Sequence, residues 1–132
     1  MSEVEFRTIM LGVASTWVDG DAAGAAAYFH DDAVYEEPPK QQFYRGRENI
    51  LAFFRDVMDG DVRLAMKWHN LAFNPGAEIG FGEYTFARLS QFHGIVTVRF
   101  KDGRILKWRE YQYQSDLPWS DFAGESGFRS ED

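Results

Sequence analysis

Hydrophobic residues recur at helical spacing through the first part of the chain. This period predicts an amphipathic helix over about residues 3–18, a short helix over 22–29 and a third helix over about 47–59. The apolar face of the first helix is formed by Phe6, Ile9, Met10, Val13 and Trp17, and that of the third by Ile50, Phe53, Phe54, Val57 and Met58. Between the second and third helices, Ala33-Val34-Tyr35 predicts a short strand, which Pro38-Pro39 ends because proline cannot continue a hydrogen-bonded ladder.

In the second half of the chain the hydrophobic period changes to two. Strands are predicted over about residues 64–73, 78–90, 93–101 and 104–114, with hairpin turns at Asn74-Pro75-Gly76 and Lys101-Asp102-Gly103. Helices followed by antiparallel strands predict an α+β fold. The helices would cover a curved sheet and enclose a cone-shaped cavity. We expect one domain over residues 1–114 and a polar C-terminal tail over 115–132, partly docked or disordered.

Composition adds an unusual load of aromatic rings to this picture. Aromatic residues make up 17% of the 132 residues, with 12 Phe, 6 Tyr and 4 Trp. In so small a domain, either the core is rich in rings or some of the rings line a cavity for an apolar ligand.

Charge and residue content exclude several classes of function. A net charge of −7, without a dense run of Lys or Arg, disfavours nucleic acids and anionic membranes as partners. The absence of cysteine excludes disulfides and thiol chemistry, and no His-x-x-x-His spacing suggests a metal. The N-terminus has no signal-peptide pattern, and no apolar run is long enough to span a membrane. We therefore expect a cytoplasmic protein without metal or cofactor.

Several short motifs, taken in order, resemble those of the NTF2-like superfamily and of the SnoaL-like proteins within it. The resemblance covers about residues 5–114. It is carried by Trp17-Val-Asp-Gly-Asp21, Tyr28-Phe-His-Asp-Asp-Ala-Val34, Tyr44-Arg-Gly-Arg-Glu-Asn-Ile50 after Pro38, and Asp102-Gly-Arg-Ile-Leu-Lys-Trp-Arg-Glu-Tyr111. It implies a cone of about three helices on a curved antiparallel sheet around a pocket. It does not fix the activity, because this fold hosts both enzymes and non-catalytic modules.

The stretch Asp31-Asp32-Ala-Val-Tyr-Glu-Glu37-Pro38 resembles a pattern of the ketosteroid isomerases. The resemblance places Glu37 where those enzymes hold the carboxylate that shuttles a proton. Their two oxyanion donors fall on Val13 and near Val96, which cannot donate, so steroid isomerisation is disfavoured. The Asp–Arg–Asp trio of epoxide hydrolases is also not recognisable.

Two glutamates are the candidate catalytic residues. We expect Glu37 to act as a general base at the cavity mouth, with Glu36 facing solvent; the alternative is a solvated acid before a proline turn. Alternation along the last strand places Trp108, Glu110 and Gln112 on one face, which the resemblance makes the cavity face. Glu110 is then the partner acid or, alternatively, forms a structural hydrogen bond to a helix end or to Arg45 or Arg47.

Further residues are candidates for contact with a substrate. The parity of the strand around Trp68 and His69 stays open, and Glu83, which the resemblance turns inward, could instead form a salt bridge to Arg88 or Arg99. His93 is expected to be exposed in a hairpin, and Gly80-Phe81-Gly82 to mark a bulge or bend. The candidate substrate-binding residues are Trp17, Tyr28, Tyr35, Phe54, Trp68, His69, Glu83, Val98, Trp108 and Gln112.

Three functional hypotheses follow. The first is an acid/base enzyme, of isomerase, hydratase or cyclase type, that acts on a small apolar, cyclic molecule. The second is a non-catalytic module that binds such a molecule, and the third is an interaction domain whose interior is filled by side chains. In each case we expect a homodimer through the outer sheet face, which carries Lys107, Arg109, Tyr111 and Tyr113.

Overall fold

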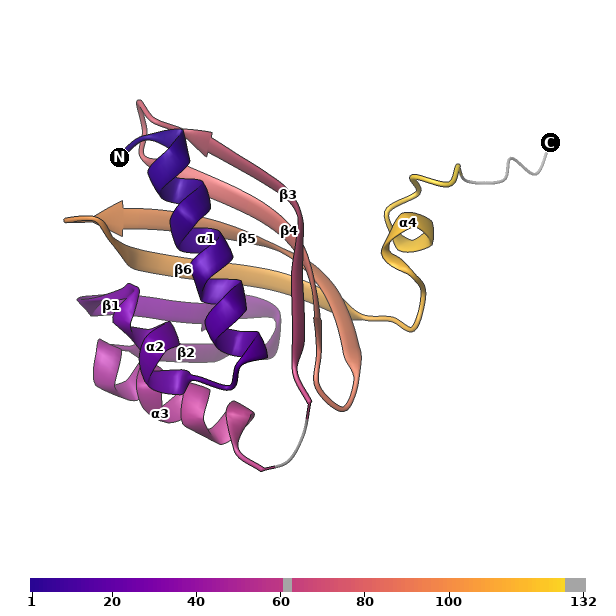
Figure 1. Cartoon of the computed structure of the whole chain (residues 1–132), viewed down its shortest axis with the longest axis horizontal. Coiled ribbons are helices and arrows are strands. Elements are labelled where there is room, and N and C mark those ends of the chain that lie inside the picture. Colours follow the sequence, from indigo (N-terminus) through magenta and orange to yellow (C-terminus); the bar gives the residue numbers. More distant parts are fainter. Residues whose placement is uncertain (61–62, 128–132) are drawn as a thin grey trace.

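Three helices lie along one side of a six-stranded sheet in the computed structural model, which describes residues 1–60 and 63–127 (Figure 1). The helices are α1 (Glu3–Val18), α2 (Ala22–Ala27) and α3 (Arg47–Met58). The strands are β1 (Phe29–Glu37), β2 (Gln42–Arg45), β3 (Ala65–Asn74), β4 (Ile79–Ala87), β5 (Gln91–Lys101) and β6 (Arg104–Gln114). A 3₁₀ turn, η1 (Pro38–Lys40), joins β1 to β2, and a short helix, α4 (Trp119–Phe122), follows β6.

The sheet order is β2-β1-β6-β5-β4-β3, and only β1 and β6 run parallel. The sheet curves around the helices without closing, so that α1 packs against β3 and α3 against β1. Within the described residues, no helix combines the length and apolar character needed to cross a membrane. The predicted α+β class is confirmed.

The predicted elements differ from the structure mainly around residues 27–45. The second helix ends at Ala27 rather than at residue 29, and β1 already begins at Phe29. Phe29 is fully buried against Phe54 and Trp108, so its side chain is needed in the core between sheet and helices. The edge strand β2 was not predicted, because its four residues show no apolar alternation.

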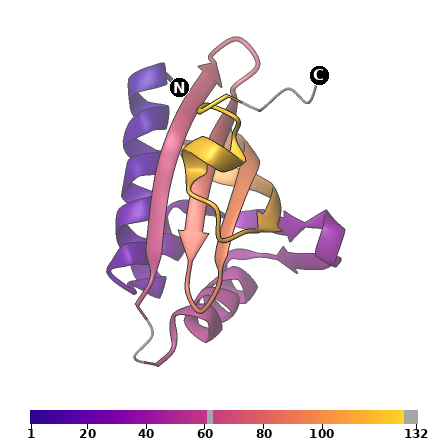
Figure 2. The ribbon, with the colours of Figure 1, turned by 90° about the vertical axis from the view of Figure 1, so that its right-hand side faces the viewer.

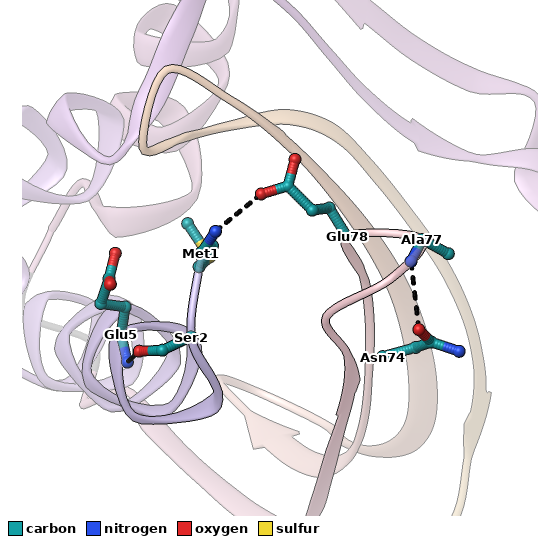
Figure 3. Close-up of polar contacts among 6 residues, drawn as sticks. All are labelled: Met1, Ser2, Glu5, Asn74, Ala77 and Glu78. Carbon is teal, nitrogen blue, oxygen red and sulfur yellow. Dashed lines mark hydrogen bonds and ion pairs between the residues drawn. The ribbon is translucent and has the colours of Figure 1, made fainter.

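The start of α1 is tied to the turn between β3 and β4 (Figure 3). The Ser2 hydroxyl caps the helix by accepting from the Glu5 amide at 3.1 Å, and the Met1 amino group donates to Glu78 Oε1 at 2.8 Å. On the turn itself, Asn74 Oδ1 accepts from the Ala77 amide at 3.1 Å. The contact between Met1 and Glu78 therefore holds the start of α1 beside this turn.

Of the bulge or bend predicted at Gly80-Phe81-Gly82, the bulge is absent, because β4 pairs with both neighbours without interruption there. The register shift lies in β3, between Trp68 and Asn70. Gly80 serves a different purpose: a Cβ at this position would overlap the ring of Phe6, which is fully buried on α1. The glycine lets α1 lie directly on the sheet.

We therefore expect Gly80→Ala to destabilise the fold by about 1–3 kcal/mol through overpacking against Phe6. Urea denaturation measures the change in the free energy of unfolding. Gly76→Ala, in the exposed turn between β3 and β4, is the matched control and should cost less than about 0.5 kcal/mol. Equal effects of the two substitutions would contradict this account of Gly80.

The segment after β6 lies on the sheet face opposite α1 (Figure 2). Trp119 of α4 stacks on His69 with ring centroids 4.2 Å apart, and Phe122 lies 4.6 Å from the ring of His93. The expectation of an exposed His93 is wrong: only 1% of it is accessible, because this segment covers it. Residues 128–132 of the predicted tail lie outside the described residues.

Candidate functional site

A cavity of about 180 Å³ lies between the inner face of the sheet and helices α1 and α3. Its walls are formed by Trp17, Tyr35, Phe53, Val57, Met66, Tyr84, Phe86, Phe92 and Trp108, and its polar groups by Glu37, Lys40, Gln42, Glu110 and Gln112. The curvature of the strands creates this space because the helices rest on part of the sheet only.

Six of the residues predicted from the sequence line this cavity. Alternation along β6 turns Trp108, Glu110 and Gln112 inward, while the neighbouring residues Arg109 and Tyr111 lie on the outer face. The other three are Trp17 on α1 and Tyr35 and Glu37 on β1. The sequence therefore correctly placed both glutamates on the inner face.

Six other predicted residues do not line the cavity. Phe54 and Val98 are fully buried in the surrounding core, and Tyr28 packs against Gly12 of α1. Trp68 points inward but lies beneath α1, where its indole Nε1 donates to the Met10 carbonyl at 2.7 Å. Its ring forms part of the core behind the cavity wall.

His69 and Glu83 lie on the outer face, so the predicted inward direction of Glu83 is wrong. Glu83 accepts a hydrogen bond from Asn70 at 3.0 Å. Among the described residues it forms no salt bridge with Arg88 or Arg99, which was the predicted alternative. The physical reason is the register of β4: Gly82 and Tyr84 are buried on the inner face, which turns Glu83 and Thr85 outward. His69 follows the same face at the bulge of β3.

Glu110 is buried and held by two hydrogen bonds to one carboxylate oxygen. The Tyr35 hydroxyl and the Trp108 indole, 2.8 Å away, both donate to Oε1. Tyr35 and Trp108 are themselves stacked, with centroids 5.9 Å apart. The pKa of Glu110 is raised to about 7, chiefly by burial and also by the charge of Glu37, against the lowering effect of these two donors.

Glu37 ends β1 and is 97% buried, with 3% of its surface accessible. Within the described residues its Oε2 has no hydrogen-bond partner. Lys40 is the cation beside it, with Nζ 4.0 Å from Oε2. Burial raises the pKa of Glu37, and the charge of Lys40 opposes that rise. Glu37 lines the cavity, and a buried carboxylate oxygen without a partner is an acceptor whose hydrogen bond a ligand can supply.

Glu36 takes the opposite direction from Glu37, as strand alternation requires. Its Oε1 lies 3.4 Å from Lys107 Nζ and 4.0 Å from Arg109 Nη1 on the outer face. Two adjacent glutamates therefore have different environments, one ion-paired and one facing the cavity.

Tyr84 is a cavity residue that the sequence analysis missed. Its hydroxyl donates to Gln112 Oε1 at 2.7 Å and also interacts with Glu110, and burial raises its pKa well above the usual range. The positions that the resemblance gives to oxyanion donors, Val13 and Val96, are buried and apolar. The hydroxyls that reach Glu110 come instead from Tyr35 and Tyr84. The alternation of β4 could have identified Tyr84, had buried Gly82 been used to set the parity.

Neither glutamate belongs to a metal-binding cluster. Across residues 1–60 and 63–127, no group of three or more His, Cys, Asp or Glu side chains is arranged to hold a metal ion.

On the outer face, a chain of hydrogen bonds joins His69 to the C-terminal segment. His93 Nε2 lies 2.7 Å from the Leu117 carbonyl, which only accepts, so this nitrogen donates. In neutral His93, Nδ1 then accepts from the Thr85 hydroxyl at 2.8 Å, and Thr85 Oγ1 accepts from His69 Nε2 at 2.6 Å. The hydrogen bonds of this chain link β3, β4 and β5 to the segment after β6.

We expect acid to loosen this segment. Burial lowers the pKa of His69, so its contribution to stability is present above the unfolded pKa of about 6.5 and is lost as the pH falls below it. An NMR titration of the Trp119 indole from pH 8 to pH 5 would follow the release. His69→Phe should keep the ring stack and weaken the pH dependence, and an unchanged wild-type signal would contradict the prediction. The titratable groups facing His69 are Lys67, Glu83, His93 and Glu125.

Comparison with known proteins identifies a family match over most of the chain. The family described as SnoaL-like domain matches residues 12–108. No curated protein sequence matches this chain significantly.

Solved structures with the same fold include an LEH-like epoxide hydrolase of Mycobacterium tuberculosis. Its sequence is 24% identical to this one. The matched region covers 83% of this chain and 84% of the hydrolase chain, with a TM-score of 0.72. A Kribbella flavida protein provisionally named a ketosteroid isomerase is 16% identical over 86% of this chain and 82% of its own, with a TM-score of 0.71. An NTF2-like protein of unknown function from Burkholderia xenovorans is 18% identical over 97% and 96%, also with a TM-score of 0.71. At these identities the likeness shows the fold alone.

Proposed function

This chain belongs to the SnoaL-like domain family, and we propose that it is an acid/base enzyme that transfers protons on a small hydrophobic molecule. The reaction would be an isomerisation, an addition or loss of water, or a cyclisation, each of which can begin with proton abstraction. Names of the structural neighbours, an epoxide hydrolase and a provisional ketosteroid isomerase, are compatible with this class of chemistry.

One observation carries the proposal: the same cavity holds an unsatisfied glutamate and a second, deeper glutamate with a different environment. Glu37 lines the cavity, and within the described residues its buried Oε2 has no hydrogen-bond partner. Glu110, with a pKa of about 7, is largely protonated at slightly acidic pH. Environments that separate the pKa values of two carboxyl groups are typical of acid/base pairs. Glu37 would remove a proton, and protonated Glu110 would polarise the substrate oxygen by donating its own proton, while its Oε1 accepts from Tyr35 and Trp108.

A second candidate function is the binding of a small molecule without turnover. The observation that favours it is that Glu110 Oε1 already accepts from both Tyr35 and Trp108, as expected of a carboxylate with a structural role. Glu37 would then be a recognition group only. The open space of the cavity favours either of these functions over an interior filled by side chains.

We also propose a homodimer through the outer sheet face. Large side chains are exposed there, in particular Ile95 and Tyr111, each 41% accessible, and Tyr113, which is 70% accessible. Exposed aromatic residues beside Arg109 are typical of protein interfaces. The oligomeric state in solution tests this, since a monomer at all concentrations would exclude it.

The test of the enzymatic proposal is deuterium exchange on small cyclic ketones. A base placed next to a bound ketone should accelerate the exchange of the ketone's α-protons with D₂O above the rate in buffer alone. NMR measures this exchange directly. Glu36→Gln is the matched control, because this side chain is paired on the opposite face of β1 and should leave exchange unchanged. Bound ketones without accelerated exchange would instead support the binding function.

A further inference from the structure

We infer that the natural ligand of this cavity is a neutral molecule with a single ring and an enolisable carbonyl or hydroxyl group placed at Glu37. This inference rests on the proposed function in its choice of the carbonyl or enol. The size and charge limits derive from the cavity itself and stand apart from any turnover.

The volume sets the size limit. A cavity of about 180 Å³ slightly exceeds the engineered cavity of about 150 Å³ that binds benzene. One ring with small substituents fills such a space. Two or more fused rings would have to displace the walls or leave part of the molecule outside the cavity.

The walls are not free to move aside, because they interlock with the core. Trp17 packs edge-on against Phe54 and Phe86, at centroid distances of 4.9 and 5.5 Å. On the opposite side, Phe53 stacks on Tyr44 at 4.2 Å. Displacing these rings would disrupt close-packed contacts, which costs free energy even for changes of one methylene.

The charges around the cavity favour a neutral ligand. Two glutamates, Glu37 and Glu110, line it, so a carboxylate on the ligand would be repelled. The cation beside Glu37 is already supplied by Lys40, whose ammonium lies 4.8 Å from the Phe92 ring centroid. A positively charged group on the ligand, placed at Glu37, would therefore be repelled by the Lys40 ammonium. A neutral hydroxyl can donate to Glu37 Oε2 without adding charge.

Phenol is a stable probe for these features, because it has one ring and presents the O–H of an enol. Together with 2-naphthol and 9-phenanthrol it forms a series in which only the number of rings changes. Benzoate keeps the single ring but carries a negative charge. Binding is followed through the indole NMR signals of Trp17 and Trp108, which line the cavity, with Trp119 on the outer face as an internal control.

In the wild-type protein, phenol should shift the Trp17 and Trp108 signals and leave Trp119 unchanged. We expect 2-naphthol to bind about tenfold more weakly or worse, and 9-phenanthrol and benzoate not to bind at comparable concentrations. Comparable affinities for phenol and either larger alcohol would overturn the size limit. Binding of benzoate as tight as that of phenol would overturn the charge limit, and failure of phenol to bind would overturn the whole inference.

Enlarging the cavity should change this selectivity in a defined direction. Phe53→Ala removes a wall ring and should raise the affinity for 2-naphthol relative to phenol by about tenfold or more. Phe43→Ala, an exposed phenylalanine outside the cavity, is the matched control and should leave the ratio unchanged. Val57→Ala is a smaller deletion on the same wall and should act in the same direction. An unchanged ratio in both wall variants would overturn the assignment of this cavity.

These measurements separate the inference from the proposed function. Selective binding of phenol without deuterium exchange on any cyclic ketone would leave the size and charge limits intact and exclude the enzyme. Exchange on ketones together with tight binding of 9-phenanthrol would support the enzyme and overturn the limit of one ring.

Discussion

Replacement of Glu37 by glutamine is expected to slow catalysed deuterium exchange by about 10²–10⁴-fold, which is the usual contribution of a positioned general base. The amide has nearly the same shape as the carboxylate and retains an oxygen that can accept from a ligand hydroxyl, but it is not basic at neutral pH. Phenol should therefore still bind, within about tenfold of the wild-type affinity, because only the charge on the acceptor is lost.

The measurement compares exchange rates by NMR and phenol affinity by titration in the same preparation. Glu36→Gln provides the control for removing one negative charge from β1, since its carboxylate pairs with Lys107 and Arg109 on the outer face. A Glu37→Gln protein that exchanges protons as fast as wild type would remove Glu37 from the role of base. Loss of phenol binding together with exchange would indicate a recognition role instead.

The fold could be predicted because its signals are local. The apolar stripe of α1 and the alternation of β6 each depend on a few neighbouring residues, and the structure places α1 at Glu3–Val18 as predicted. Alternation along β6 placed Glu110 on the same face as Trp108, and the resemblance made that face the inner one, where both residues lie in the structure.

The errors arose where the decisive contact is distant in sequence. A bulge at His69 shifts the register of β3, and no local pattern reveals it. On β4, the resemblance turned Glu83 to the wrong face. The inner face there carries Gly82, whose lack of a side chain leaves room for the Trp68 ring. His93 is buried only because Leu117 and Phe122 return to cover it. Such long-range packing is fixed by the whole fold rather than by a segment.

The environment of Glu110 could be predicted only in outline. The sequence indicated that an acid among rings needs a hydrogen-bond partner, and proposed helix ends or Arg45 and Arg47 as the alternative to a catalytic role. The structure provides the Tyr35 hydroxyl and the Trp108 indole instead. The parallel pairing of β1 with β6 sets Tyr35 opposite Trp108, and this pairing had no signal in the sequence.

We expect the stability of Glu110→Gln, measured relative to wild type at the same pH, to be higher at pH 8 than at pH 5. The pKa of Glu110 is raised from 4.5 to about 7, so the folded state binds this proton more tightly than the unfolded state does. The contribution of the protonated carboxyl is therefore fully present below about pH 4.5 and is lost as the pH rises through about 7. For a fully buried group the loss is at most on the order of 3 kcal/mol.

Glutamine cannot ionise, and its amide oxygen can still accept from Tyr35 and Trp108. Urea denaturation at pH 5, 6, 7 and 8 would give the difference in free energy of unfolding between variant and wild type, and this difference cancels the titration of groups that both proteins share. Glu3→Gln, at an exposed position on α1, controls for the loss of a surface charge and should show no such trend. If the difference for Glu110→Gln stays constant from pH 5 to pH 8, then Glu110 is ionised across this range. In that case Glu110 could not act as the proton donor beside Glu37, and the acid partner would have to be sought among the cavity hydroxyls, Tyr35 and Tyr84.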